Sequence, residues 1–160
     1  MDISVEWRNR VRKLFPDLEE GVSLEFTSEV NLNYNCLAWA VSCDTSYFEI
    51  GKGCFWPWDD IPDDTAEGWA EVCRIHGFVS VPVENIDFIP GIEKIAILAN
   101  PDGELHAARQ GKNGWWKSKL GGWGPDIDHL GLGQMRDAYG DVVEVLQRLR
   151  PDWIGDQQRR

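Results

Sequence analysis

The sequence predicts an α+β protein in which N-terminal helices pack on a small antiparallel sheet. Two observations favour this class. Residues 93–120 consist of apolar runs separated by Gly-containing turns, which is typical of an antiparallel meander. The segments ahead of the meander carry apolar residues at helical spacing and end at Pro or Gly. Because the 160 residues contain no repeat and no Gly/Ser/Pro-rich linker, we expect a single domain, residues 1–160.

The first predicted helix covers residues 5–15, where the apolar side chains form an approximate helical stripe. Pro16 ends it, and residues 17–32 read as irregular. A dense apolar run of good helix formers then begins at Leu37. Asn35 is a plausible N-cap for that run, which would put Cys36 at the first helical position.

A further helix is expected to begin at Asp64 or Thr65 and to stop at Gly77. Cys73 and His76 fall near its end, at the one spacing in the chain that suits two metal ligands. A single pair does not make a zinc site, so a buried thiol and a capping histidine are the simpler interpretation. We therefore expect no metal and no cofactor.

The meander is the clearest structural prediction. Residues 94–99 have the length and composition of a strand, and the Asp-Gly turn at 100–103 is a strong hairpin signal. Residues 104–110 form the return strand. A second turn at 111–114 leads to a third strand, 115–120.

Two shorter segments extend this picture. Residues 78–81 read as a short extended piece. Residues 142–149 match a helical stripe as well as a strand, but three valines after Tyr139-Gly140 favour the strand.

The charge excludes one class of partner. The chain has 27 acidic and 16 basic residues, a net charge of −11. Binding to nucleic acid needs a Lys/Arg footprint, and neither half of the chain is basic, so a nucleic-acid role is not expected. No apolar run is long enough to span a bilayer, and the first residues lack the pattern of a signal peptide. We expect a cytoplasmic protein, although export without a signal is compatible with the sequence.

A cysteine at a helix N-terminus and a histidine on a strand together suggest nucleophilic catalysis. The helix terminus stabilises the thiolate of Cys36, and a neighbouring imidazole can take its proton. His106 lies on the predicted return strand, beside small residues that leave room for close packing. Cys36 alone also fits a small buried hydrophobe, and His106 alone a core histidine. Their joint placement favours a catalytic pair.

This order of residues resembles the papain-like fold in its circularly permuted, NlpC-like form. That family presents Asp-Cys-Ser-Gly at a helix start and then a strand beginning at His. Here Asn35-Cys36 is followed by Leu-Ala, so the Asp and the Ser-Gly are absent. The family's third polar residue often comes twelve residues after the His. That position is Ser118 here, where His, Asn or Gln is more usual, and a serine hydroxyl can hold the imidazole tautomer only more weakly.

The chain is also similar to uncharacterised bacterial proteins that share Asn-Cys-x-Ala-Trp-Ala, a Trp-Pro loop, a His strand and Ser-Lys-Leu-Gly. These motifs stand at residues 35–40, 56–58, 106 and 118–121, and the likeness covers about residues 27–150. It implies no established activity.

Several alternatives stay open around the pair. A one-residue slip of the hairpin would turn Lys119 rather than Ser118 toward His106, and Lys119 also suits an anionic substrate group or a solvated surface. His129 is a rival base, whose pKa the adjacent carboxylates would raise. Asn33 and Tyr34 could supply oxyanion-hole or substrate contacts, together with the backbone of residues 35–36.

Tryptophans in or beside loops fit two roles: they can line the rim of a cleft that binds sugars or peptides, or they can fill small cores under the loops. They are Trp56, Trp58, Trp115, Trp116 and Trp123.

The sequence thus predicts a cysteine hydrolase of amide bonds, acting on a peptide, a protein or a peptidoglycan stem peptide. Cys36 attacks, His106 is base and acid, and Ser118 steadies the imidazole. The alternative is a binding, immunity or regulatory module with the same fold, using an acidic face and Trp loops on a protein partner. Acyl or glutamyl transfer on the same dyad is a third option.

Overall fold

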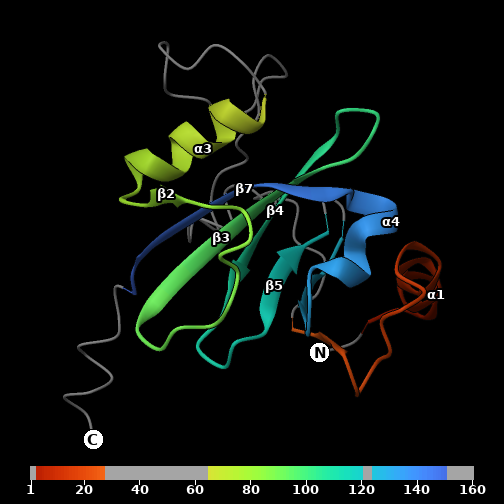
Figure 1. Cartoon of the computed structure of the whole chain (residues 1–160). Helices are drawn as coiled ribbons and strands as arrows, with labels where there is room; N and C mark the ends of the chain where they lie inside the picture. Colours follow the sequence, from red (N-terminus) through yellow and green to blue (C-terminus); the bar gives the residue numbers. More distant parts are fainter. Residues whose placement is uncertain (1–2, 28–64, 121–123, 151–160) are drawn as a thin grey trace, which may run out of the picture.

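The computed structural model describes residues 3–27, 65–120 and 124–150 of the chain. These residues form one seven-stranded sheet with helices on both faces, so the predicted α+β class is confirmed (Figure 1). The strand order is β1-β6-β5-β4-β3-β7-β2, and all the neighbouring strands run antiparallel. The sheet is larger than the small one that the sequence predicts.

The predicted meander is present at the centre of this sheet. It consists of β3 (Ile92–Ala99), β4 (Leu105–Gln110) and β5 (Trp116–Lys119). The Asn100 side-chain oxygen closes the first turn by accepting hydrogen bonds from the backbone N–H groups of Asp102 and Glu104, at 3.0 and 2.9 Å. Gly103 has a φ of 83°, a conformation that glycine adopts without strain. The turn therefore fixes the register of β3 against β4, the central strand.

Four more strands extend the meander. On one side lie β6 (Asp126–His129) and β1 (Leu24–Phe26), and on the other β7 (Asp141–Leu149) and β2 (Val79–Val81). The strand interpretation of the last segment is confirmed, and the helical one is wrong. The irregular interpretation of residues 17–32 is wrong at β1, because three residues with mixed burial give no periodic pattern.

The two described N-terminal helices begin and end close to where the sequence predicts. In α1 (Val5–Leu14) the Ser4 hydroxyl caps the first turn, and in α3 (Ala66–Ile75) the Thr65 hydroxyl accepts from Gly68 N–H at 3.1 Å. The 3₁₀ helix η1 (Gly133–Met135) and the short α4 (Arg136–Tyr139) were not predicted. Within the described ranges, no helix has the length and apolar character needed to cross a membrane.

The strand register separates two faces of the sheet. One face, here called the histidine face, carries residues 106 and 108 of β4, 116 and 118 of β5, and 127 and 129 of β6. It is covered by α1, η1 and α4, whose apolar side chains form cores with it; these include Val11, Phe15, Leu132 and Met135. Trp116 is buried in one of these cores, so it does not line a cleft.

The opposite face, here called the α3 face, carries Glu93, Ile95 and Ile97 of β3 and the residues paired with them. Helix α3 packs there against β3, β7 and β2, on the other side of the sheet from α1 and α4 (Figure 1). The Arg148 guanidinium of β7 reaches up to this helix and donates a hydrogen bond to the carbonyl of His76 at 2.6 Å.

Candidate active site

Three polar side chains form a continuous hydrogen-bonded chain inside the histidine face. His106 Nε2 lies 2.9 Å from the Ser118 hydroxyl oxygen, and that oxygen lies 2.7 Å from His129 Nε2. His129 Nδ1 lies 3.0 Å from the carbonyl oxygen of Gly131. The three side chains are at most 1 % exposed. Ser118 therefore connects two imidazoles that are almost completely buried.

The sheet register brings these residues together. Ala108 of β4 pairs with Ser118, and Ser118 pairs with Ile127 of β6. His106 and His129 each lie two residues from those partners, so both are diagonal neighbours of Ser118 on the same face. Diagonal positions in an antiparallel pair are within reach of long side chains. Three short polar groups on three adjacent strands can thus form one chain.

Aromatic packing holds the first imidazole in place. The Tyr139 ring stacks on His106 with centroids 3.9 Å apart and planes 9° apart, and its centroid lies 5.3 Å from that of Phe15, the C-cap of α1. Gly140, with a φ of 82°, turns the chain from Tyr139 into β7. A Cβ at residue 140 would lie 2.0 Å from the Ala99 carbonyl oxygen, so only glycine permits this close approach.

Burial sets the protonation state of both histidines. Desolvation, helped by the charge of His129, lowers the pKa of His106 from 6.5 to about 3. Desolvation also lowers the pKa of His129 to about 4, although the Gly131 carbonyl and Asp128 act in the opposite direction. Both rings are therefore neutral at neutral pH, with one N–H donor and one acceptor nitrogen each.

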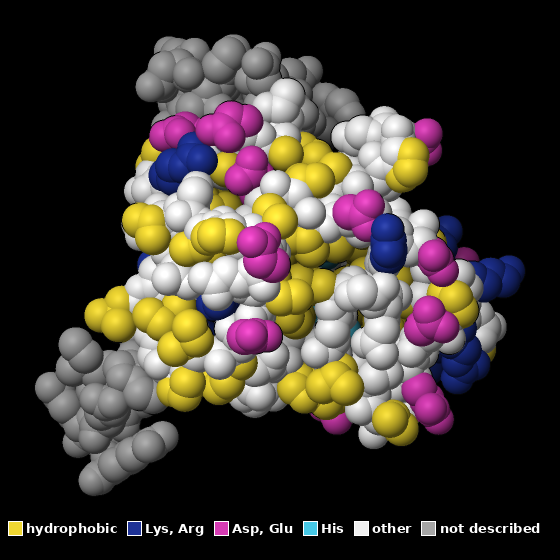
Figure 2. All heavy atoms as spheres, viewed as in Figure 1, with side chains coloured by type: hydrophobic (Ala, Val, Ile, Leu, Met, Phe, Trp, Pro, Cys, Tyr) yellow, Lys and Arg dark blue, Asp and Glu magenta, His cyan; other side chains and the backbone are white. Residues whose placement is uncertain are grey.

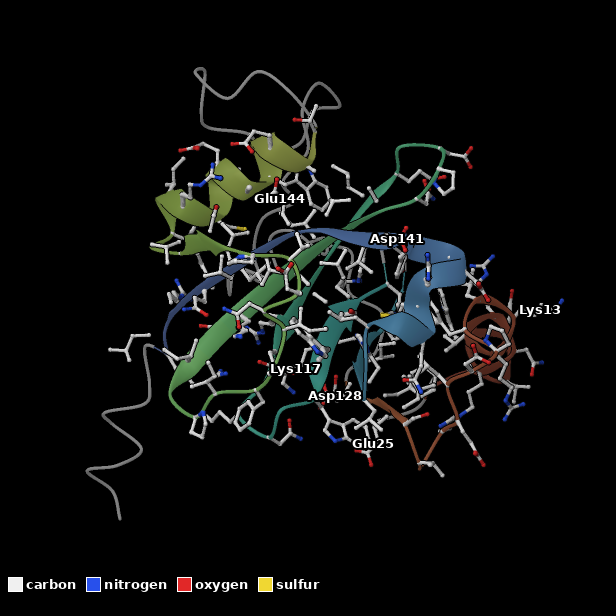
Figure 3. All side chains as sticks on the ribbon, viewed as in Figure 1. Lys13, Glu25, Lys117, Asp128, Asp141 and Glu144 are labelled. Atoms are coloured by element: carbon white, nitrogen blue, oxygen red, sulfur yellow. The ribbon has the colours of Figure 1, made fainter. Side chains whose placement is uncertain are left out.

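The prediction that neighbouring carboxylates raise the pKa of His129 is wrong. Successive strand residues point to opposite faces, so Asp128 and Asp126 lie on the α3 face while His129 lies on the histidine face. Asp128 pairs instead with Lys117, whose Nζ lies 2.9 Å from both of its carboxylate oxygens, and Figure 3 shows the two side chains together. Desolvation of His129 then outweighs the more distant negative charge.

The alternative register, with Lys119 facing His106, is wrong as well. Ser118 faces His106, and Lys119 is fully buried on the α3 face, where its ammonium donates to the Gly124 carbonyl. It is thus neither a solvated surface lysine nor a neighbour of the two imidazoles. His129 belongs to the same hydrogen-bonded chain as His106 and Ser118, and its role as an alternative base stays a prediction.

The remaining predicted site residues lie outside the described residues; they are Asn33, Tyr34, Asn35, Cys36, Trp56 and Trp58. Of the two members of the proposed dyad, the structure therefore describes His106. In the part of the chain that the structure describes, no group of three or more His, Cys, Asp or Glu side chains could hold a metal ion.

Sequence reasoning missed Tyr139 and Met135 as neighbours of the site. Tyr139 stacks on His106, and the Met135 sulfur lies 4.0 Å from the Ser118 hydroxyl. Both come from the short helical segment between β6 and β7, which carries no long periodic pattern. The sequence pair Tyr139-Gly140 could have indicated this neighbour. Gly140 is required because the backbone passes close to the Ala99 carbonyl, and that turn places Tyr139 over the sheet.

A pocket and a cysteine–histidine pair lie apart from the hydrogen-bonded histidine chain. A pocket of about 570 Å³ lies between α1 and β1, lined by Arg8, Arg12, Glu19 and Glu20 among others, and the histidine chain does not line it. Cys73 is fully buried, and its burial raises the pKa of the thiol to about 12, while His76 caps α3 through Val72 O at 2.8 Å. The structure thus confirms a buried thiol and a capping histidine there.

The fold and site together define an α+β protein with a central antiparallel sheet. One face of this sheet carries an uncharged, hydrogen-bonded chain of His106, Ser118 and His129. Residues 25–147 match the family described as "Domain of unknown function (DUF7689)", and the chain belongs to that family. The match covers every strand of the sheet except for the ends of β1 and β7. No curated protein and no solved structure matches the chain.

Proposed function

We propose that this protein is a cysteine hydrolase of papain-like, NlpC-like type that cleaves an amide bond in a peptide, a protein or a peptidoglycan stem peptide. The observation that supports it is the contact between His106 Nε2 and Ser118 Oγ at 2.9 Å. Because Nε2 is engaged with Ser118, Nδ1 is the nitrogen that serves a nucleophile. Cys36, at the expected start of a helix, is that nucleophile.

In this proposal the neutral His106 takes the thiol proton as the Cys36 sulfur attacks the carbonyl carbon of the substrate. The imidazolium then returns the proton to the leaving amine, and a thioester remains on Cys36. Water, deprotonated by the same imidazole, hydrolyses the thioester and releases the acid and the free thiol. Burial disfavours the imidazolium, so it gives up its proton readily to the leaving amine.

An activated ester tests the proposal without a known substrate. The full chain is incubated with para-nitrophenyl acetate, and the acetylated residue is mapped by mass spectrometry. We expect one acetyl group on Cys36 that is lost again with time, and no acetylation in His106→Gln. Cys73, with its raised thiol pKa, is an internal control that stays unmodified. Equal, slow labelling of Cys36, Cys43 and Cys54 would contradict the proposal.

The burial of His106 supports a second candidate, a binding or regulatory module that keeps the fold without turnover. The imidazole is 1 % exposed, stacked under Tyr139, and its pKa is lowered to about 3, which are also properties of a structural core histidine. Figure 2 shows histidine atoms only as small spots in gaps of the surface. Acidic side chains are scattered over that face, and a cationic protein partner suits them. Absence of Cys36 acetylation would favour this candidate.

A further inference from the structure

The direction of each hydrogen bond in the histidine chain follows from its last member. The Gly131 carbonyl oxygen can only accept, so His129 Nδ1, 3.0 Å away, carries the proton. A neutral imidazole has one N–H, and His129 is neutral because desolvation lowers its pKa to about 4. His129 Nε2 is therefore a lone-pair acceptor.

The direction of both hydrogen bonds of the Ser118 hydroxyl then follows. Ser118 Oγ lies 2.7 Å from that acceptor nitrogen, so the Ser118 O–H donates to His129 Nε2. Its oxygen then has only lone pairs to offer to His106 Nε2 at 2.9 Å, which must carry the proton of the neutral ring. Every donor in this chain meets one acceptor. The opposite direction of the hydrogen bonds would need the Gly131 carbonyl to donate, and a carbonyl oxygen can only accept.

We propose that His129 is a positioning residue that acts through the Ser118 hydroxyl to hold His106 in the tautomer with its proton on Nε2 and its lone pair on Nδ1. This inference rests on the proposed function, in which Nδ1 accepts the thiol proton. It also explains how serine can stand where a carboxamide is more usual. A lone hydroxyl can donate or accept, and the second histidine leaves it only the accepting role toward His106.

The tautomers can be read directly in solution. The chain contains three histidines, so ¹⁵N-histidine labelling gives three rings whose N–H positions are resolved in long-range ¹H–¹⁵N spectra at neutral pH. We expect the His106 proton on Nε2 and the His129 proton on Nδ1. A wild-type spectrum with the His106 proton on Nδ1 would overturn the inference, and this result needs no variant.

Two variants test the coupling. In His129→Leu the Ser118 hydroxyl loses its acceptor and can donate to His106, so we expect the Nδ1–H tautomer to gain population and Cys36 acetylation to slow by about tenfold or more. In His129→Gln the amide oxygen accepts from Ser118, so the Nε2–H tautomer and the rate should recover. His76→Gln removes the third histidine, outside the chain, and should change neither readout.

The outcomes separate the inference from the proposed function. If the spectra of His129→Leu show no tautomer shift while Cys36 acetylation still needs His106, the inference fails and the proposed function stands. If the tautomers respond as expected but acetylation does not depend on His106, the proposed function fails and the tautomer assignment stands.

Discussion

Two buried polar groups on opposite faces of the sheet are stabilised in different ways. On the histidine face, His106, Ser118 and His129 are neutral and connected only by hydrogen bonds. On the α3 face, Arg148 lies 3.2 Å from the Glu93 carboxylate, and its guanidinium stacks on the ring of Phe78 at 4.2 Å. The first group needs no charge, whereas the second depends on two opposite charges.

Alternation along each strand decides the chemistry of a polar residue in this sheet. Asp128 and His129 are adjacent in sequence, yet one forms an ion pair with Lys117 and the other enters a neutral chain. Burial therefore keeps both histidines uncharged, although the charge of Asp128 raises the pKa of His129. A base kept neutral by burial can accept a proton but does not hold it, which suits transfer to a leaving group.

The largest expected effect is on the charged group. Arg148→Met removes the guanidinium that lies 3.2 Å from the buried Glu93 carboxylate and removes the donor to the His76 carbonyl. The charge of Arg109 still acts on Glu93, and we expect a loss of about 3 kcal/mol in the free energy of unfolding, measured in urea. The double variant Glu93→Leu/Arg148→Met should recover much of that loss. A single-variant loss below about 1 kcal/mol would contradict the importance of the pair.

The next effect concerns acid stability. Both folded-state histidine pKa values lie below the unfolded value of 6.5, so the unfolded chain binds more protons once the pH falls below 6.5. Stability should thus be complete well above that pH and fall by about 2–3 kcal/mol as the pH decreases to about 5.5, because each histidine contributes about 1.4 kcal/mol per pH unit. His106→Gln/His129→Gln should flatten this part of the curve. An equal slope in wild type and the double variant would contradict the assignment.

The middle of the neutral chain should be less costly to remove. Ser118→Ala leaves one N–H of His106 and one lone pair of His129 without a partner, so we expect a loss of about 1–3 kcal/mol by thermal or urea unfolding. Ser80→Ala is a matched control, because Ser80 is an exposed strand residue bonded to Arg74. Equal effects of the two substitutions would contradict a structural role for the buried hydroxyl.

The smallest effect is expected at the partly exposed pair of β5 and β6. The Lys117 side chain is 30 % exposed and pairs with Asp128 at 2.9 Å, so Lys117→Met should cost less than about 1 kcal/mol (Figure 3). The cost should shrink further in high salt, because water and ions screen such a pair. A salt-independent loss as large as that of Arg148→Met would remove the distinction between the two pairs.

Local signals explain what the sequence could predict. The Asn100 turn, the Thr65 cap and the glycine after α3 act within a few residues, so the elements that they bound were predicted closely. The turn also fixed which face His106 occupies, and the twelve-residue spacing to Ser118 is the spacing at which their side chains meet.

Long-range pairing explains what the sequence could not predict. Strand β1 has three residues and is defined by its pairing with β6, which lies about 100 residues later in the chain. The stack of Tyr139 on His106 depends on how α4 returns over the sheet. The pKa of His129 was predicted in the wrong direction because sequence neighbours were treated as spatial neighbours, and a strand separates them onto two faces.

The pH dependence of Cys36 alkylation is the decisive test of the proposed Cys36–His106 pair. Iodoacetamide labelling of the full chain is followed at each cysteine across a pH series, in wild type and in His106→Gln. We expect a Cys36 inflection well below the free-thiol pKa of about 8.5 that is lost in the variant, with Cys43 and Cys54 titrating as ordinary thiols. A Cys36 profile that is the same in both proteins and similar to those of the other cysteines would contradict it.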